Sequence, residues 1–196
     1  MLRRLYDWIL DLSKRPIALP AMTLLSLAES SFFPIPPDVM LIPMCVANRA
    51  RALVYAFWCS FGSVVGGVIG YAIGYFLWDD VSGFFFDLIP GFDQELFDSM
   101  QGYYEEWNFW IVFAAGFTVI PYKIFTISGG VFAVGFPMFV VASALSRSAR
   151  FFLEAYLIKR YGEKAQVWIE ERFNLVATVL VAVLILAVVG LSMLKH

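Results

Sequence analysis

The stretch Glu29-Ser-Ser-Phe-Phe-Pro-Ile-Pro-Pro-Asp38 places two carboxylates and three prolines inside a segment that is otherwise apolar. Proline breaks a helix, and both charge and broken backbone are costly in hydrocarbon unless protein or a water-filled cavity surrounds them. An apolar return over residues 39–48 follows. Two short arms joined by a proline-rich break predict a re-entrant helical hairpin, which enters and leaves a membrane on one side. A single kinked span over residues 17–47 is the alternative.

A second stretch repeats this pattern 85 residues further along the chain. The first reads Phe-x-x-Ile-Pro-x-Asp over residues 32–38, and the second reads Phe-x-x-Ile-Pro-x-Lys over residues 117–123. One copy carries an acid where the other carries a base. Paired hydrophobic segments with such interruptions are typical of transporters built from inverted repeats, whose binding site lies near the membrane midplane.

The composition is that of an integral membrane protein. The chain is 61% hydrophobic and 15% charged, whereas soluble domains carry about 25% charged residues. No basic stripe with interleaved aromatic residues is present, so we expect no nucleic-acid partner. The one histidine is His196, and no cysteine or histidine spacing fits a metal site. The sequence therefore predicts neither an enzyme nor a cofactor or metal site.

Uncharged stretches mark the predicted membrane spans. Residues 52–78 hold no charge, and neither do residues 173–194, whereas a spanning helix needs about 20 apolar residues. Gly135-Phe-Pro137 starts another span, which runs to Leu157. Hairpin plus span thus occurs twice, entering from opposite faces. The predicted fold class is an all-α integral membrane protein, an inverted repeat of re-entrant helical hairpin plus transmembrane helix, with an extra C-terminal transmembrane helix.

The sequence predicts a single membrane domain over residues 1–196. Apolar residues at helical spacing near the N-terminus indicate an amphipathic helix that lies in the membrane interface. In chain order the predicted parts are this interfacial helix (1–15), the first repeat (16–78), an acidic loop (79–106), the second repeat (107–158), a cytoplasmic segment (159–172) and the C-terminal transmembrane helix (173–194).

Charge asymmetry gives the expected orientation. Residues 79–106 hold acids and no lysine or arginine, whereas Arg49 and Arg51 lie at the other end of the span over residues 52–78. By the positive-inside rule, residues 79–106 are extracytoplasmic and the N-terminus is cytoplasmic.

Four glycines form a smooth strip along one face of the predicted span over residues 52–78. They are Gly62, Gly66, Gly70 and Gly74, one at every fourth residue. Small residues at this spacing let the backbone of another helix approach closely. The strip predicts helix packing, either against a helix of the same chain or against a second copy in a homo-oligomer.

Charged residues within the apolar segments are the candidate site, because each costs about 2.5–3.5 kcal/mol at the centre of a spanning helix. Arg147 and Arg150 lie three residues apart on one helical face, and paired guanidinium groups suit the oxygens of a phosphate. The candidate residues are Glu29, Asp38, Lys123, Arg147 and Arg150.

Each candidate also has a structural alternative. Asp38 follows two prolines and precedes an apolar run, so it fits the N-cap of the returning helix. The two arginines could reach the cytoplasmic interface or pair with Glu154. Lys123 could form a buried pair with Glu29 or with Asp38.

The pattern resembles the DedA family, also called the VTT or SNARE-associated membrane protein family, and most of all its YqaA-like branch. The resemblance covers residues 16–157. In the first hairpin, Glu29 followed by Ile-Pro-Pro-Asp over residues 35–38 is similar to the family's glutamate and apolar-Pro-Gly-acid motif. In the second, Ile-Pro-Tyr-Lys over residues 120–123 and the later Gly-Gly are similar to its apolar-Pro-x-x-Arg and Ala-Gly, with lysine replacing arginine one position early.

The resemblance implies two opposed re-entrant hairpins that meet near the midplane of a bacterial inner membrane. It also implies lipid translocation, since bacterial members are tied to undecaprenyl phosphate recycling and to envelope homeostasis that depends on the proton motive force, and eukaryotic relatives are phospholipid scramblases. The implied partners are membrane lipids and protons. Glu29 and Asp38 would be the proton-sensitive acids, and Lys123 with Arg147 or Arg150 would take the lipid phosphate. The expected hairpin breaks are Pro34, Pro36, Pro37, Pro121, Gly129 and Gly130.

Other functions fit the same residues. A proton- or cation-coupled carrier for a small solute would use the carboxylates without needing the arginine pair. A non-transporting membrane assembly factor would act through the glycine strip. An intramembrane hydrolase is disfavoured, because the apolar segments hold no histidine and no pairing of serine with lysine or histidine.

Overall fold

The computed structural model describes residues 15, 17–33, 35–88, 94–118 and 122–162. Every regular element within these residues is a helix, which confirms the all-α prediction. The predicted C-terminal span, residues 1–14 of the predicted interfacial helix and residues 163–172 lie outside them. In chain order the helices are α2 (Ala18–Ser31), α3 (Asp38–Ala47), the 3-10 helix η1 (Arg49–Arg51), α4 (Ala52–Leu88), α5 (Gln94–Phe117), α6 (Tyr122–Val131) and α7 (Phe136–Tyr161).

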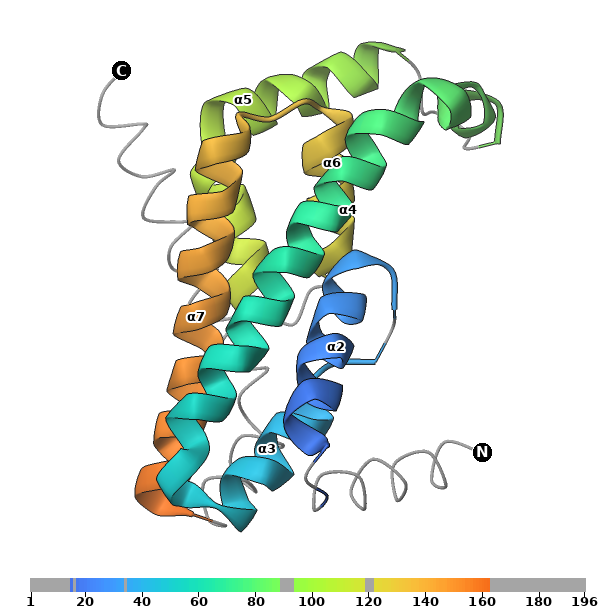
Figure 1. Cartoon of the computed structure of the whole chain (residues 1–196). Helices are drawn as coiled ribbons and strands as arrows, with labels where there is room; N and C mark the ends of the chain where they lie inside the picture. The colour runs from blue at the N-terminus through green and yellow to red at the C-terminus, as the bar shows by residue number, and fades with distance from the viewer. Residues whose placement is uncertain (1–14, 16, 34, 89–93, 119–121, 163–196) are drawn as a thin grey trace, which may run out of the picture.

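The first proline-rich stretch separates two short helices that run in opposite directions, α2 and α3 (Figure 1). Beyond Ser31, the backbone N–H groups of Phe32 and Phe33 both donate to the carbonyl of Ala28, which closes the last turn of α2. α3 begins directly after Pro37, whose fixed φ of −68° suits a helix start. The prolines carry no N–H for a helix that would run through them, so the chain breaks here instead of kinking.

The second hairpin consists of the last turns of α5 and the short helix α6. α6 ends at Val131, and a turn through Ala133, which has a positive φ of 51°, leads into α7. Figure 1 shows that this hairpin opens toward the opposite end of the molecule from the α2–α3 hairpin. The tips of the two hairpins therefore face each other in the middle.

The long helices α4 and α7 lie side by side and join two apolar clusters, one in each half of the molecule (Figure 1). The first cluster unites α2, α3, the start of α4 and the end of α7, with Phe151 at its edge. The second unites the end of α4 with α5, α6 and the start of α7, as far as Ala142. The buried residues of α7 between these two are polar, namely Ser143, Ser146, Arg147 and Arg150.

The acidic segment over residues 79–106 is not the loop that the sequence predicted. α4 continues to Leu88, and α5 begins at Gln94, so the described part of this segment is helical. Charge alone does not end a helix, because glutamate is a good helix former and acids can face water along one side. The helix breakers of this segment are Pro90 and Gly91, which stand between the two helices in the sequence.

One helix is long and apolar enough to cross a membrane, judged by length and composition within the described residues. It covers Arg49–Trp78, that is η1 and most of α4, with a mean hydropathy of 1.8. This helix agrees with the predicted span over residues 52–78 and indicates membrane association.

Candidate functional site

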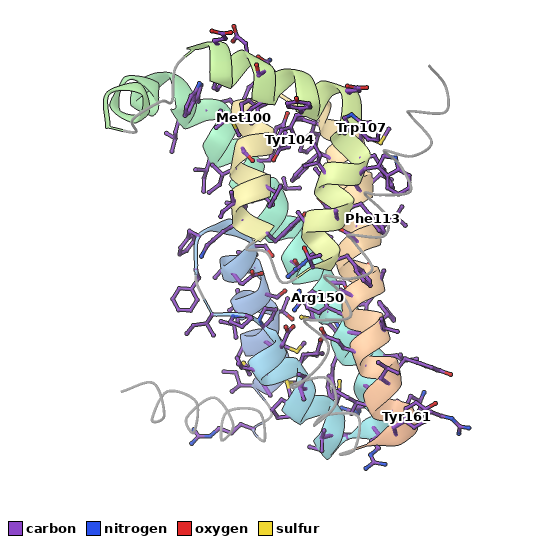
Figure 2. The ribbon with its side chains drawn as sticks, turned by 180° about the vertical axis from the view of Figure 1, so that it is seen from behind. Met100, Tyr104, Trp107, Phe113, Arg150 and Tyr161 are labelled. Atoms are coloured by element: carbon purple, nitrogen blue, oxygen red, sulfur yellow. The ribbon has the colours of Figure 1, made fainter. Side chains whose placement is uncertain are left out.

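Arg147 and Arg150 face the interior of the protein and lie between the two apolar clusters. They are 3% and 6% exposed, so they do not reach toward an interface. Figure 2 shows Arg150 in the middle of the molecule, well away from Tyr161 at one end and from Met100 at the other. Two guanidinium groups at such a depth require partners, because a buried unpaired charge is strongly destabilising.

Arg147 is held by a hydrogen-bonded network that reaches the first hairpin. Its guanidinium lies 3.1 Å from the carboxylate of Glu29, and its Nε donates to the hydroxyl of Ser63 at 2.5 Å. The hydroxyls of Ser63 and Ser30 are 2.7 Å apart, and Ser30 donates to Glu29 at 3.1 Å. One polar network thus joins α2, α4 and α7 between the two apolar clusters.

Arg150 joins the break of the first hairpin to the end of α5. One terminal nitrogen lies 2.5 Å from the carboxylate of Asp38, and the other donates to the backbone carbonyl of Thr118 at 2.6 Å. Its Nε lies 3.4 Å from the carboxylate of Glu154, one turn further along α7. Pairing with Glu154, which the sequence offered as an alternative to a site, therefore occurs together with pairing to Asp38.

Two aromatic rings also pack against the guanidinium group of Arg147. Its guanidinium carbon lies 4.9 Å from the ring centroid of Tyr122 and 4.6 Å from that of Phe151. Cations within about 6 Å of a ring centroid are attracted to the ring face. One terminal nitrogen also donates to the carbonyl of Gly116, at 3.5 Å. The arginine therefore contacts both hairpins, through Glu29 and through α5 and α6.

Asp38 does not act as the N-cap of α3. The N-cap position is Pro37, which makes no side-chain cap, and Asp38 is the first residue of the helix. Its carboxylate is instead directed to Arg150.

Lys123 lies apart from the two ion pairs. It is partly exposed, and its ammonium donates to the backbone carbonyl of Phe33 at 3.3 Å. Glu29 and Asp38 pair with the arginines, so the buried lysine–carboxylate pair that the sequence also allowed is not formed. Close by, Thr126 donates to the carbonyl of Ser30 at 3.1 Å. Both bonds run from α6 to the end of α2 or the break after it, and they tie the two hairpin tips together.

The predicted hairpin breaks divide into three groups. Pro36 and Pro37 lie in the break between α2 and α3, where Pro36 is exposed and Pro37 is buried. Pro34 and Pro121 lie outside the described residues. Gly129 and Gly130 are not a break, because α6 continues through both to Val131. Gly130 is instead a packing residue, since a Cβ there would lie 2.0 Å from the carbonyl oxygen of Tyr71.

The glycine strip of α4 packs against α2 of the first hairpin and α6 of the second. A Cβ added at Gly62 or Gly66 would lie 2.4 or 2.1 Å from a backbone oxygen of α2. A Cβ at Gly70 would lie 2.3 Å from the hydroxyl of Thr126, and one at Gly74 would lie 1.9 Å from a backbone oxygen of α6. The partner of the strip is internal, so these four residues are occupied without a second copy of the chain.

Sequence reasoning missed the serines of this site. Ser30 and Ser63 are fully buried. Their hydroxyls are hydrogen-bonded to each other, and they connect Arg147, which donates to Ser63, with Glu29, which accepts from Ser30. Ser26 and Ser31 also donate to backbone carbonyls of α4. The available signal was the clustering of small hydroxyl residues within an apolar segment, which is typical of closely packed membrane helices.

Comparisons with known proteins found similarity to two bacterial proteins. An uncharacterized protein of Haemophilus influenzae is 37% identical over 193 residues, which cover 98% of this chain and 97% of that protein. An uncharacterized protein of Histophilus somni is 36% identical over 191 residues, with 97% of each chain covered. No model of a known protein family matches the chain, and no solved structure matches it.

Proposed function

We propose that this chain, which belongs to one protein family with the Haemophilus influenzae and Histophilus somni proteins, translocates a lipid with a phosphate headgroup across a bacterial inner membrane. This is the function that the resemblance to the DedA family implies. The observation that carries the proposal is the pair of buried arginines, each neutralised by a carboxylate from the first hairpin, where the tips of two opposed hairpins meet.

A multi-pass arrangement is supported by the surface of α7 as well as by α4. α7 has 26 residues, which is about 39 Å of helix and exceeds an apolar core of about 30 Å. Its charges at Arg147, Arg150 and Glu154 are buried in protein, which is how intramembrane charges are tolerated. Large apolar or aromatic side chains that are exposed recur at helical spacing along it before the basic residues at its end, namely Met138, Val141, Leu145, Leu153 and Tyr156.

The charge at the two ends supports a cytoplasmic N-terminus. Arg49 and Arg51 at the start of α4 and Lys159 and Arg160 at the end of α7 are all exposed. Arg49 packs so closely on Gly162 that a Cβ there would overlap its guanidinium group, so these residues share one end of the molecule. The acidic start of α5 lies at the opposite end (Figure 1). By the positive-inside rule, the basic end faces the cytoplasm.

The proposed mechanism exchanges one anion for another at the arginines. A phosphate offers the same geometry to a guanidinium group as a carboxylate does, with more oxygens. Protonation of Glu29 or Asp38 removes the charge that holds Arg147 or Arg150, and a lipid phosphate then takes the vacated face. Lys123, which is partly exposed beside the break, receives the headgroup first, while the acyl or polyprenyl chain stays in the lipid.

Flux in proteoliposomes tests the proposal. Fluorescent polyprenyl phosphate and fluorescent phospholipid are incorporated separately, and the fraction shielded from an external quencher is followed with time under an imposed pH gradient. Wild type is expected to move one of the two lipids, and Glu29→Gln and Lys123→Ala are each expected to slow it at least about tenfold, the loss that about 1.4 kcal/mol of transition-state stabilisation produces. The controls are Glu106→Gln and Lys159→Ala, which change exposed residues of the same types.

Two outcomes would contradict the proposal. Unchanged lipid movement in both Glu29→Gln and Lys123→Ala would show that these groups have no part in translocation. No movement of either lipid by folded wild-type protein would instead favour a proton-coupled carrier for a small solute, which uses the same carboxylates.

A further inference from the structure

The buried cluster around the two arginines has more acids than bases. Its carboxylates are those of Glu29, Asp38 and Glu154, and its guanidinium groups are those of Arg147 and Arg150. With all five groups ionised, the cluster carries one uncompensated negative charge. A low-dielectric interior strongly disfavours such a charge, and a buried carboxylate relieves it by taking up a proton.

Of the three carboxylates, that of Glu154 has the weakest contact with an arginine. It is 1% exposed, its Oε1 lies 3.4 Å from the Nε of Arg150, and its Oε2 has no hydrogen-bond partner among the described residues. Charge-assisted bonds to carboxylates are usually about 2.7–2.9 Å long, so this contact is weak. By contrast, one oxygen of Glu29 accepts from both Arg147 and Ser30.

The surroundings of Glu154 favour its neutral form. It lies on α7 beside Phe151, Ala155 and Ile158, which are buried members of the first apolar cluster. A buried, ionised oxygen that accepts no hydrogen bond loses its hydration without compensation. A protonated carboxyl is neutral, so burying it without a hydrogen bond costs much less free energy. The charged or titratable groups that act on it are Asp38 and Cys45 of α3, Cys59 of α4, and Arg147 and Arg150 of its own helix, while Glu29 of α2 is paired with Arg147.

We infer that Glu154 is a proton-binding site and carries the proton that makes this cluster neutral at neutral pH. Asp38 offers a further oxygen, Oδ1, that is buried and has no hydrogen-bond partner within the described part of the chain. Glu154 and Asp38 thus flank the guanidinium group of Arg150, and each has one oxygen paired with it and one that no described residue hydrogen-bonds. Use of this proton during translocation rests on the proposed function, whereas the proton site itself does not.

Infrared spectroscopy of the protein in lipid bilayers tests this inference without any transport. A protonated carboxylic acid has a carbonyl stretch at higher frequency than a carboxylate, and the band shifts in heavy water. At neutral pH we expect such a band from a buried acid in wild type, its loss in Glu154→Gln, and its retention in the exposed control Glu106→Gln. Glutamine has the shape of a protonated glutamic acid, so Glu154→Gln is expected to fold.

Isotope labelling of glutamate side chains supplies an assignment that needs no substitution. The band must move when glutamate carries the label, and it must stay in place when aspartate does. Absence of the band in wild type, its persistence in Glu154→Gln, or its movement with labelled aspartate would overturn the inference. Because this readout is independent of flux, a protein with the Glu154 band but no lipid movement would refute only the proposed function.

Discussion

Replacing Arg147 by methionine tests whether the Arg147–Glu29 pair holds the two halves of the molecule together. Methionine keeps much of the apolar stem but removes the guanidinium group, which contacts Glu29, Ser63 and the rings of Tyr122 and Phe151. Removing one partner of a buried pair costs about 3–5 kcal/mol, because the other charge is left uncompensated. The side chain of Glu29 is 14% exposed, so water can reach the carboxylate that is left behind, and we expect the lower end, about 3 kcal/mol.

The double variant Arg147→Met, Glu29→Gln separates charge pairing from packing. Glutamine removes the stranded charge but keeps the shape of Glu29 and its contact with Ser30, so the double variant is expected to be more stable than Arg147→Met alone. The coupling energy between the two sites is expected to be about 2 kcal/mol, within the range for residues in direct contact. Unfolding of the purified protein in mixed micelles, titrated with a denaturing detergent, measures all four free energies of the cycle.

Additive free energies for the two substitutions would show that Arg147 and Glu29 do not interact. A coupling energy below about 0.5 kcal/mol is what distant, independent sites show. Lys159→Met is the matched control, since Lys159 is an exposed base at the end of the same helix, and its free energy of unfolding is expected to stay within about 0.5 kcal/mol of wild type.

Three further changes test other parts of the structure by the same unfolding measurement. Gly66→Ala is expected to destabilise the protein by about 3 kcal/mol, because its Cβ would lie 2.1 Å from a backbone oxygen. Gly102→Ala, with nothing within 4 Å of the added Cβ, is expected to stabilise the protein by about 0.5–1 kcal/mol. Equal effects of the two changes would contradict the packing described for the glycine strip. Ser63→Ala is expected to cost about 1.5–3 kcal/mol through its lost bond to Arg147, and no loss would mean that this bond is absent. Lys123→Ala is expected to cost less than about 1 kcal/mol, since it breaks one partly exposed bond, and a larger loss would point to a structural role.

The sequence predicts the helices of this fold because their limits depend on local chemistry. The proline-rich stretch up to Pro37 separates one helix from the next, and glycines at every fourth residue identify the packed face of α4. The prediction of a loop over residues 79–106 is wrong for the described part of that segment, because solvated acidic residues can also lie along the exposed side of a helix.

The pairing within the site could not be predicted from the sequence. Glu29 and Arg147 are 118 positions apart, and Asp38 and Arg150 are 112 positions apart. Which acid meets which base depends on how closely α2 and α6 approach α4, and the backbone contacts at the glycines fix that approach. The residue types and the two hairpins were visible in the pattern, but the exclusion of Lys123 from the ion pairs follows only from the packed structure.

If the arginine–carboxylate site lies deep within a membrane, as we propose, a spin label at Leu145 must lie in the hydrocarbon core. Leu145 is 53% exposed and belongs to the outward stripe of α7, close in sequence to Arg147. Tyr161, also exposed, lies about 24 Å further along the helix axis, which is more than half of an apolar core of about 30 Å. Single labels at Leu145→Cys and Tyr161→Cys, with buried Cys45 and Cys59 replaced by alanine, are compared in lipid bilayers.

Collision rates with oxygen, which concentrates in hydrocarbon, and with a water-soluble nickel complex report the depth of each label. We expect the Leu145 label to collide with oxygen and to be protected from the nickel complex, and the Tyr161 label to show the reverse. A Leu145 label as accessible to the nickel complex as the Tyr161 label would place the arginines in water and rule out a site within the membrane.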